Sequence, residues 1–255
     1  MKHIGKSYDK VDAKGILSGK PSYTGDFVPK DALIIKVLRS PHAQAKIKSI
    51  DTSKAKLIPG VEAIFTYEDV PNTRFTLAGQ TYPEPSAYDA LILDPVVRYV
   101  GDEVALVVAK DEATALKAMP LIKVEYEVQK PVLDLRTAMD HETVVHPEDD
   151  ILNHIPVGQD YKRNICVSYH KRVGDIEGEL AKCDYVVEGT YFDQATRQSA
   201  MEPFQSFGYI DHLGRIVIVS STQIVFHVRR HIARALGIPA SKIRVIKPRI
   251  GGGFG

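Results

Sequence analysis

Short runs of hydrophobic residues, rich in Val, Ile and Ala, recur along the first half of the chain and predict β-strands. These runs cover residues 32–40, 61–67 and 103–109. Asp111, a favourable N-cap residue, then precedes a helical pattern in which Ala115, Leu116 and Met119 share one face. The pattern returns to a strand at residues 121–129. This order of strand, helix and strand predicts an α+β fold.

The hydrophobic pattern also divides the chain. Residues 1 to about 15 are polar and predict a surface arm, after which the strand pattern begins. Residues 131–162 combine prolines, acidic residues and histidines without a sustained apolar period, which is typical of a linker between domains. We therefore predict a first domain over residues 15–130, a linker over residues 131–162 and a second region over residues 163–255.

Patterned segments resume after the predicted linker. Strands are expected at residues 166–174 and 184–193, followed by a hairpin whose strands, 207–210 and 215–221, flank a turn at residues 211–214. From Thr222 or Gln223 the apolar period changes to four residues and predicts an amphipathic helix with the stripe Ile224, Val228, Ile232 and Leu236.

The end of this predicted helix is marked by Gly237, with Pro239 beyond it. Its arginines lie away from the apolar stripe and are expected on a solvated face; they are Arg229, Arg230 and Arg234. A short strand at residues 242–247 then leads into a run of glycines.

The composition is that of an ordinary globular protein, with 44% hydrophobic and 25% charged residues in a chain of 255. The 33 Lys and Arg residues nearly balance the 32 Asp and Glu residues, and no basic cluster is interleaved with aromatics, which argues against a nucleic-acid partner. No apolar run approaches the ~18 residues that cross a bilayer, and the first residues lack the apolar core of a signal peptide. We expect a cytoplasmic protein without a membrane partner.

Residues that ligate metals are few or poorly grouped. Cys166 and Cys183 are too few for a disulfide framework, a structural zinc site or an iron–sulfur cluster held by this chain alone, and we interpret them as small buried side chains or inert thiols. His227 and His231 form the best histidine pair, four residues apart on the predicted helix, but no third ligand is near them in the sequence. No metal ligand is predicted within this chain.

The C-terminal residues Gly251-Gly252-Gly253-Phe254-Gly255 are the first candidate for chemistry. Glycines can adopt positive φ and can turn successive backbone N–H groups toward an anion or an oxo ligand, but they suit a structural turn equally well. Gln223 lies at the predicted junction of strand and helix, where side chains and free N–H groups point outward together. Either Gln223 donates to a ligand, or Ser221 or Thr222 caps the helix and Gln223 lies in its solvated first turn.

Matching stretches along nearly the whole chain resemble one family. In the first half they are SYTGDF at 22–27, LRSPHAQAKIKSID at 38–51, PGVEAIFTYEDVP at 59–71, VRYVGDEVALVVAKDEATALKA at 97–118 and IKVEYE at 122–127. In the second half they are DYVVEGTY at 184–191, AMEP at 200–203, SSTQ at 220–223, ALGIPASKIRVI at 235–246 and IGGGFG at 250–255.

These stretches resemble the molybdopterin-binding subunit of the xanthine dehydrogenase and aldehyde oxidase family. The resemblance implies an a/b hammerhead domain followed by the truncated first part of an α+β molybdopterin-binding domain. Residues 78–102 are most similar to xanthine dehydrogenases of the selenium-dependent, purine-hydroxylating type.

The resemblance also implies roles for individual residues. Gln223 is expected to hydrogen-bond an oxo ligand of molybdenum, and the metal's oxo face and the pterin are expected to be lined by the backbone of Gly252, Gly253, Phe254 and Gly255. Neutral amide and backbone N–H donors stabilise anionic oxygen without ligating the metal or adding a titrating group. The family's general base is expected beyond Gly255, so no catalytic residue is predicted in this chain. Glu202 is interpreted as structural or channel-lining, and not as that base.

The implied activity is that of a molybdenum hydroxylase that oxidises purines such as xanthine or hypoxanthine, with water as the oxygen source. The molybdenum–molybdopterin cofactor performs the chemistry in the complete enzyme, and electrons pass to iron–sulfur clusters and FAD on partner domains or subunits. The expected partners are the remainder of the molybdenum subunit, the iron–sulfur and FAD subunits and a purine substrate, with room for a homo-oligomer.

Two alternative functions stay open at this stage. One is a molybdenum hydroxylase of aldehydes or of N-heterocycles such as nicotinate, and the other is a non-catalytic assembly module. Because the sequence ends inside the glycine run, we expect residues 1–255 alone to be inactive, and we expect strands near the C-terminus to leave an exposed edge and apolar surface.

Overall fold

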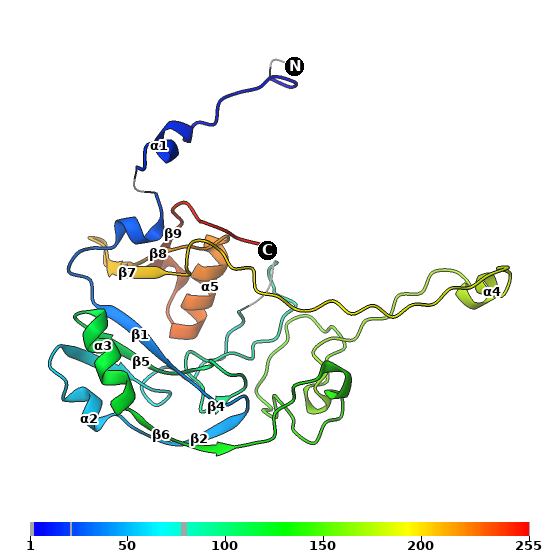
Figure 1. Cartoon of the computed structure of the whole chain (residues 1–255), viewed down its shortest axis with the longest axis horizontal. Helices are drawn as coiled ribbons and strands as arrows, with labels where there is room; N and C mark the ends of the chain where they lie inside the picture. The colour runs from blue at the N-terminus through cyan, green and yellow to red at the C-terminus, as the bar shows by residue number, and fades with distance from the viewer. Residues whose placement is uncertain (1–2, 21, 78–80, 255) are drawn as a thin grey trace.

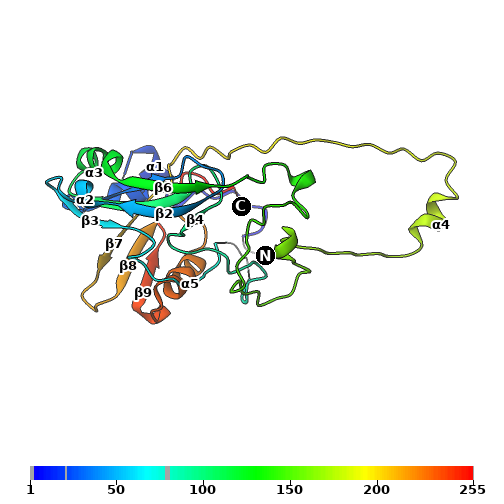
Figure 2. The same ribbon diagram turned by 90° about the horizontal axis from the view of Figure 1, so that it is seen from below.

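Three small β-sheets form the body of the protein in the residues that the computed structural model describes, 3–20, 22–77 and 81–254 (Figure 1). The strand orders are β1-β5-β3, β4-β2-β6 and β7-β8-β9. The first two sheets are built from residues 34–128, and the third lies beside them together with helix α5 in both views (Figures 1 and 2). The mixture of strands and helices confirms the predicted α+β fold.

The first two sheets are antiparallel throughout. The first contains β1 (Ile34–Arg39), β5 (Glu103–Ala109) and β3 (Val61–Phe65). The second contains β4 (Val96–Val97), β2 (Ala45–Asp51) and β6 (Lys123–Val128). Short helical segments connect these strands: α2 (Ser53–Lys56), α3 (Glu112–Ala118) and the 3-10 turn η2 (Met119–Leu121). The four strands predicted in this half are confirmed, whereas β2 and β4 were not predicted.

The core of this half lies on both faces of β5. Ala105, Val107 and Ala109 pack against α3, while Val104 points into a second cluster with residues of β2 and β4. Side chains alternate between the two faces because the strand repeat is two residues. Asp111 caps α3 as predicted, with its Oδ1 accepting a hydrogen bond from the Thr114 backbone N–H at 2.7 Å. Of the predicted face of α3, Ala115 is buried as expected, but Leu116 is 51% exposed and Ala118 is buried in its place.

The third sheet combines a hairpin with a parallel crossover. Its strands are β7 (Ser206–Ile210), β8 (Ile216–Ser220) and β9 (Ile243–Ile246), with β7 antiparallel and β9 parallel to β8. Helix α5 (Val225–Leu236) connects β8 to β9, followed by the 3-10 turn η5 (Ala240–Lys242). Gly237 ends α5 with a φ of 65°, a left-handed conformation that suits glycine. The hairpin, the helix, its end and the last strand are all confirmed.

The prediction that the arginines of α5 lie on a solvated face holds for Arg234, which is exposed, but is wrong for Arg229 and Arg230, which are partly buried. Arg230 forms an ion pair with Glu84, whose side chain is buried, and Arg234 donates from Nε to the backbone O of Arg74 at 2.8 Å. Ile224 and Leu236, by contrast, are exposed at the two ends of the predicted apolar stripe. The guanidinium groups of Arg230 and Arg234 hold α5 against Glu84 and Arg74 through charge-assisted hydrogen bonds.

Residues 166–199, which we call the arm, extend away from the body and carry the short helix α4 (Ile176–Leu180) (Figures 1 and 2). The strands predicted at 166–174 and 184–193 are wrong, because neither segment has strand structure. Their apolar residues are exposed, including Tyr191 at 94%. A strand needs a neighbour to bond its N–H and C=O groups, and in the described residues these two segments are not paired with one.

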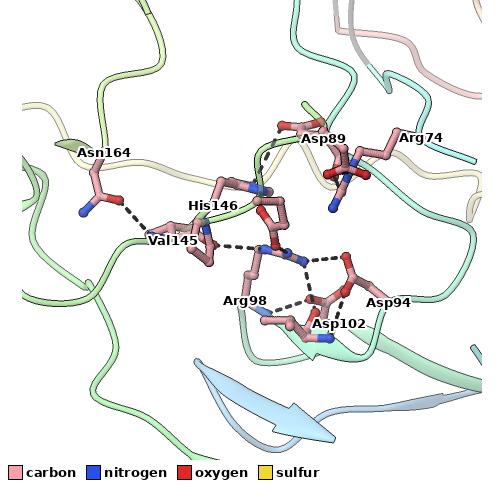
Figure 3. A network of polar contacts seen from close by, with 12 residues as sticks. Arg74, Asp89, Asp94, Arg98, Asp102, Val145, His146 and Asn164 are labelled. Atoms are coloured by element: carbon pink, nitrogen blue, oxygen red, sulfur yellow. Dashed lines mark hydrogen bonds and ion pairs between the residues drawn. The ribbon is translucent and has the colours of Figure 1, made fainter. Parts of the chain in front are cut away.

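The predicted linker is tied to the first domain by a polar network (Figure 3). Arg98 forms ion pairs with Asp94 and Glu148 and donates from Nε to the Val145 backbone O at 3.2 Å. Asn164 Oδ1 accepts a hydrogen bond from the Val145 N–H at 2.8 Å. Two 3-10 turns lie in or beside this segment, η3 (Leu135–Thr137) and η4 (Tyr161–Arg163). Charged contacts therefore hold this segment, whose sequence lacks a sustained apolar period.

The N-terminal residues form helix α1 (Ala13–Leu17) and the 3-10 turn η1 (Thr24–Phe27). They contact the second region of the chain at Arg249. Asp12 forms an ion pair with Arg249, and the Arg249 N–H donates to the Ser22 backbone O at 2.9 Å. Residues 22–27 thereby lie close to the strand that leads into the glycines. Within the described ranges, no helix has the length and apolar character that crossing a membrane requires.

Candidate functional site

Gln223 and the glycine loop, which we define as residues 251–254, meet in the structure although they are 30 residues apart at the point of contact. Gln223 Nε2 donates a hydrogen bond to the backbone O of Gly253 at 3.1 Å. Gln223 follows β8, which ends at Ser220, and precedes α5, which begins at Val225, so its predicted place between strand and helix is confirmed. Gly255, the last residue of the predicted site, lies outside the described residues.

Close contacts require glycine at three successive positions of the loop. A Cβ on Gly251 would lie 2.5 Å from the Cβ of Glu202, and a Cβ on Gly252 would lie 2.9 Å from the Cβ of Ala200. A Cβ on Gly253 would lie 2.6 Å from Oε1 of Gln223. Gly252 also has a φ of 145°, which disfavours any side chain. The loop is thus packed against Gln223 on one side and residues 200–202 on another.

The segment before β7 holds the other side of the loop. Glu202 Oε2 accepts a hydrogen bond from the Gly251 backbone N–H at 2.6 Å, and Gln205 Nε2 donates to Glu202 Oε1 at 3.4 Å. The carboxylate of Glu202 is therefore engaged with the protein backbone, in the structural position that the sequence interpretation gave it.

The Gln205 backbone and Ser221 bond one another directly. The Ser221 N–H donates to the Gln205 backbone O at 3.2 Å, and the Gln205 N–H donates to Ser221 Oγ at the same distance. Neither Ser221 nor Thr222 caps α5, because Ile224 is the N-cap residue and no side chain accepts from the first turn. The alternative in which these hydroxyls only cap the helix is therefore wrong.

The residues at this site fit a cofactor that presents anionic oxygens. In the part of the chain that the structure describes, the N–H groups of Gly252, Gly253 and Phe254 donate to no protein acceptor. Together with the neutral amide of Gln223 they form a set of donors without a charged or metal-ligating side chain. Such donors suit oxo groups and a pterin, because they stabilise anionic or carbonyl oxygen without displacing it from a metal.

The other candidate ligands are not brought to this site. The rings of His227 and His231 lie 5.9 Å apart on α5, and among the described residues no group of three or more His, Cys, Asp or Glu side chains is placed to hold a metal. Cys166 and Cys183 are free thiols, and both are exposed, so their expected burial is wrong. Their chain segment lacks the neighbouring elements that would bury them.

A separate cavity of about 620 Å³ lies between α5 and residues 73–76 and 82–88. Glu84 lines it, and although burial favours the neutral acid, hydrogen bonds from Tyr88 and Arg230 outweigh burial and lower the pKa of Glu84. Burial and the Glu84 carboxylate together raise the pKa of Tyr88 to about 12. Burial also lowers the pKa of His231, which keeps that ring neutral. This cluster has no signature in the sequence, since Glu84 and Arg230 are 146 residues apart.

Comparison with known proteins assigns both halves of the chain. Residues 18–130 match "Aldehyde oxidase and xanthine dehydrogenase, a/b hammerhead domain", and residues 157–255 match "Molybdopterin cofactor-binding domain". The chain belongs to the xanthine dehydrogenase and aldehyde oxidase family. The predicted family and its molybdopterin cofactor are confirmed by these matches.

Individual relatives show how the family varies. The chain is 40% identical to "Probable hypoxanthine oxidase XdhD" of Escherichia coli K12 over 99% of its length, covering 29% of that protein. It is 31% identical to the "Nicotinate dehydrogenase large molybdopterin subunit" of Eubacterium barkeri, covering 99% of this chain and 55% of the relative. Among solved structures, the aldehyde oxidoreductase of Desulfovibrio gigas superposes with a TM-score of 0.79 at 26% identity, over 98% of this chain and 27% of that one. The chain therefore spans less than a third of the length of the hypoxanthine oxidase relative.

Proposed function

We propose that this chain supplies one wall of the cofactor site of a molybdenum hydroxylase. The contact of Gln223 with Gly253 carries the proposal, because it joins the only side-chain donor predicted for the site to the loop whose backbone N–H groups are available. When bound, the molybdenum–molybdopterin cofactor supplies the redox chemistry. The domain boundaries at 15–130, 131–162 and 163–255 belong to this proposal, and the matched ranges 18–130 and 157–255 support them.

Each residue of the wall has a distinct task. The amide of Gln223 would donate to an oxo ligand, and the backbone N–H groups of Gly252, Gly253 and Phe254 would be available to the anionic oxygens of the cofactor and to the pterin. Gly255 is assigned to the same wall from its sequence position. Because none of these donors titrates near neutral pH, the affinity that this wall contributes stays constant across that range.

The substrate that we propose is a purine such as xanthine or hypoxanthine. The support for a purine is the 40% identity to a hypoxanthine oxidase, compared with 31% to the nicotinate dehydrogenase subunit. We propose that electrons leave through iron–sulfur clusters and FAD on partner domains or subunits. Nicotinate or an aldehyde is the alternative substrate class, because relatives that are named for these substrates match the chain over nearly its full length.

The cofactor role is tested by measuring pterin bound per molecule of the whole protein, using the fluorescence of the oxidised pterin. We expect Gln223→Ala to reduce the bound pterin, because the wall loses its one side-chain donor. Thr222→Ala is a matched control next to it, since the Thr222 hydroxyl bonds only the Ile224 N–H among the contacts described. Equal pterin content in wild type and Gln223→Ala would contradict the assigned role.

The substrate class is tested on the same protein with its electron-transfer partners. A panel of hypoxanthine, xanthine, nicotinate and an aromatic aldehyde is offered at equal concentrations, and kcat/KM is compared. We expect the purines to be preferred. Preference for nicotinate or the aldehyde would leave the cofactor role intact and overturn the purine assignment.

A further inference from the structure

Two segments far apart in sequence, residues 199–202 and 251–254, pack backbone against backbone. The Glu202 N atom lies 3.1 Å and its Cβ lies 2.5 Å from where a Cβ on Gly251 would be. Ser199 and Phe254, at the outer ends of the two segments, adopt φ values of 51° and 62°. Such left-handed conformations cost on the order of 1–3 kcal/mol in residues other than glycine and persist only where surrounding contacts enforce them. Contacts between residues 199–202 and 251–254 therefore enforce these backbone conformations.

Glu202 makes the polar contact between these segments. Its Oε2 accepts the Gly251 N–H at 2.6 Å, and a hydrogen bond from a backbone N–H to a carboxylate is stronger than one to a neutral oxygen. Gly251 immediately precedes the three residues whose N–H groups are available to a ligand. By fixing the peptide plane of Gly251, Glu202 holds the loop at the point where those N–H groups begin.

The contacts continue from Glu202 to Gln223. Gln205 donates to Glu202 Oε1 at 3.4 Å, and the Gln205 and Ser221 backbones bond each other two residues before Gln223. The hydrogen bond from Gln223 to Gly253 completes a closed series of contacts, which runs from Glu202 through Gln205 and Ser221 to Gln223 and back to the glycine loop. The side-chain donor and the backbone donors of the proposed cofactor wall are thus fixed relative to each other through Glu202.

We propose that Glu202 is a positioning residue that fixes the glycine loop for cofactor binding. This role rests on the proposed function of the wall, but the loop contact itself can be tested without the cofactor. Glu202 touches neither a reacting atom nor the ligand side of the loop, and it acts through the Gly251 N–H.

The loop contact is tested by NMR on the protein labelled with 15N-glycine. We expect the Gly251 amide proton to resonate far downfield in the wild type and to move upfield in Glu202→Ala. Its hydrogen exchange should become roughly ten- to a hundredfold faster, as loss of a hydrogen bond to a charged group predicts, while the Gly208 amide in β7 keeps its rate. Glu202→Gln retains an oxygen acceptor and should restore much of the protection.

Glu188→Gln is the control, because Glu188 is an exposed residue of the arm. It should leave Gly251 unchanged. An unchanged Gly251 signal in Glu202→Ala would overturn the positioning role. Equal acceleration of exchange at Gly251 and Gly208 would also overturn it, because it would show a general loss of folding.

Pterin content separates this role from the proposed function. We expect Glu202→Ala to bind severalfold less pterin than the wild type and Glu202→Gln to fall between them. If Gly251 responds and the wild-type protein binds no pterin, the cofactor proposal fails while the loop contact stands. If Gly251 responds and Glu202→Ala holds as much pterin as the wild type, the positioning role is overturned and the cofactor proposal stands.

Discussion

Gly253 leaves no room for a side chain beside Gln223. Because an added Cβ would lie 2.6 Å from the Gln223 Oε1, Gly253→Ala must displace the amide and break its bond to the loop. We expect the Gln223 side-chain NH₂ signals to shift and the bound pterin to decrease severalfold. Gly15→Ala is the control, since its Cβ would meet only Lys20 Cδ, at an ordinary 3.7 Å. Unshifted Gln223 signals in Gly253→Ala would contradict this prediction, because they would show that the loop moves to accommodate the new Cβ and leaves the amide in place.

The Glu148 carboxylate makes the free energy of unfolding depend on pH in the acidic range. Burial favours its neutral form, but the His146 imidazole and the Arg98 guanidinium outweigh burial and lower the pKa of Glu148 to about 2. The folded pKa lies below the unfolded value of about 4.3, so the stabilisation is complete above that value and is lost as the pH falls toward about 2. Its full size is about 3 kcal/mol on this basis.

Urea unfolding at pH 6 and pH 3 tests this dependence. We expect wild type to exceed Glu148→Gln in unfolding free energy at pH 6, and we expect the difference to shrink at pH 3, where unfolded Glu148 is protonated. Glu142→Gln is the control, because Glu142 pairs with Lys130 on the surface, where solvent screens the charges. A difference that stays constant from pH 6 to pH 3 would contradict the assignment.

At the scale of elements, the ion pair of Glu84 with Arg230 holds α5 against the segment that contains Glu84. Glu84 is 1% exposed and also accepts a hydrogen bond from the Tyr88 hydroxyl at 2.8 Å. Glu84→Ala would leave Arg230 without its partner, and we expect a loss of about 3–5 kcal/mol in unfolding free energy. Glu84→Gln keeps the shape and one acceptor and should lose less.

Chemical denaturation measures both variants, with Glu62→Gln on exposed β3 as the matched control. The control should stay within about 0.5 kcal/mol of wild type. If Glu84→Ala matched the control, the ion pair with Arg230 would contribute nothing to holding α5 in place.

Most elements that pack within the described chain were predictable from sequence, with β2 and β4 as the exceptions. β5 and α5 were predicted because their apolar periods match the geometry of the element and both are packed, as Val107 and Ala233 show. The segments at 166–174 and 184–193 have an equally good strand pattern, but a pattern records hydrophobicity and not the presence of a neighbouring strand. Arg230 was expected in solvent for the same reason, since its buried partner lies 146 residues away.

The site was predictable only in part. Gln223 and the glycine loop were found by their resemblance to a family, and the structure brings them into contact, while their roles toward the cofactor stay predictions. The task of Glu202 could not be found from its residue type, because a carboxylate that accepts a backbone N–H has no signature in the sequence. Its partner is set by how residues 199–202 cross the loop, which is a property of the tertiary fold.

At the scale of the whole molecule, the arm contrasts with a body stabilised by two cores. Its exposed apolar side chains include Tyr185, Val187, Tyr191 and Phe192. Such residues in extended backbone are readily cleaved and readily pair with other chains. We expect chymotrypsin to cut within residues 185–192 first, and mass spectrometry of the early products should find these cuts before any in β5 or α5. Early cleavage inside the body would contradict this order.

The same exposure predicts that the arm drives self-association. Unpaired backbone and alternating apolar side chains at residues 184–193 can form strands with a second copy, and charge on such a strand opposes that pairing. We expect the double variant Val187→Lys and Phe192→Lys to raise severalfold the concentration at which light scattering detects oligomers. Gln194→Lys with Gln198→Lys adds the same charge to the arm without removing apolar surface, so it should shift that concentration less. Equal shifts in the two double variants would mean that net charge, and not the apolar strand pattern, governs association.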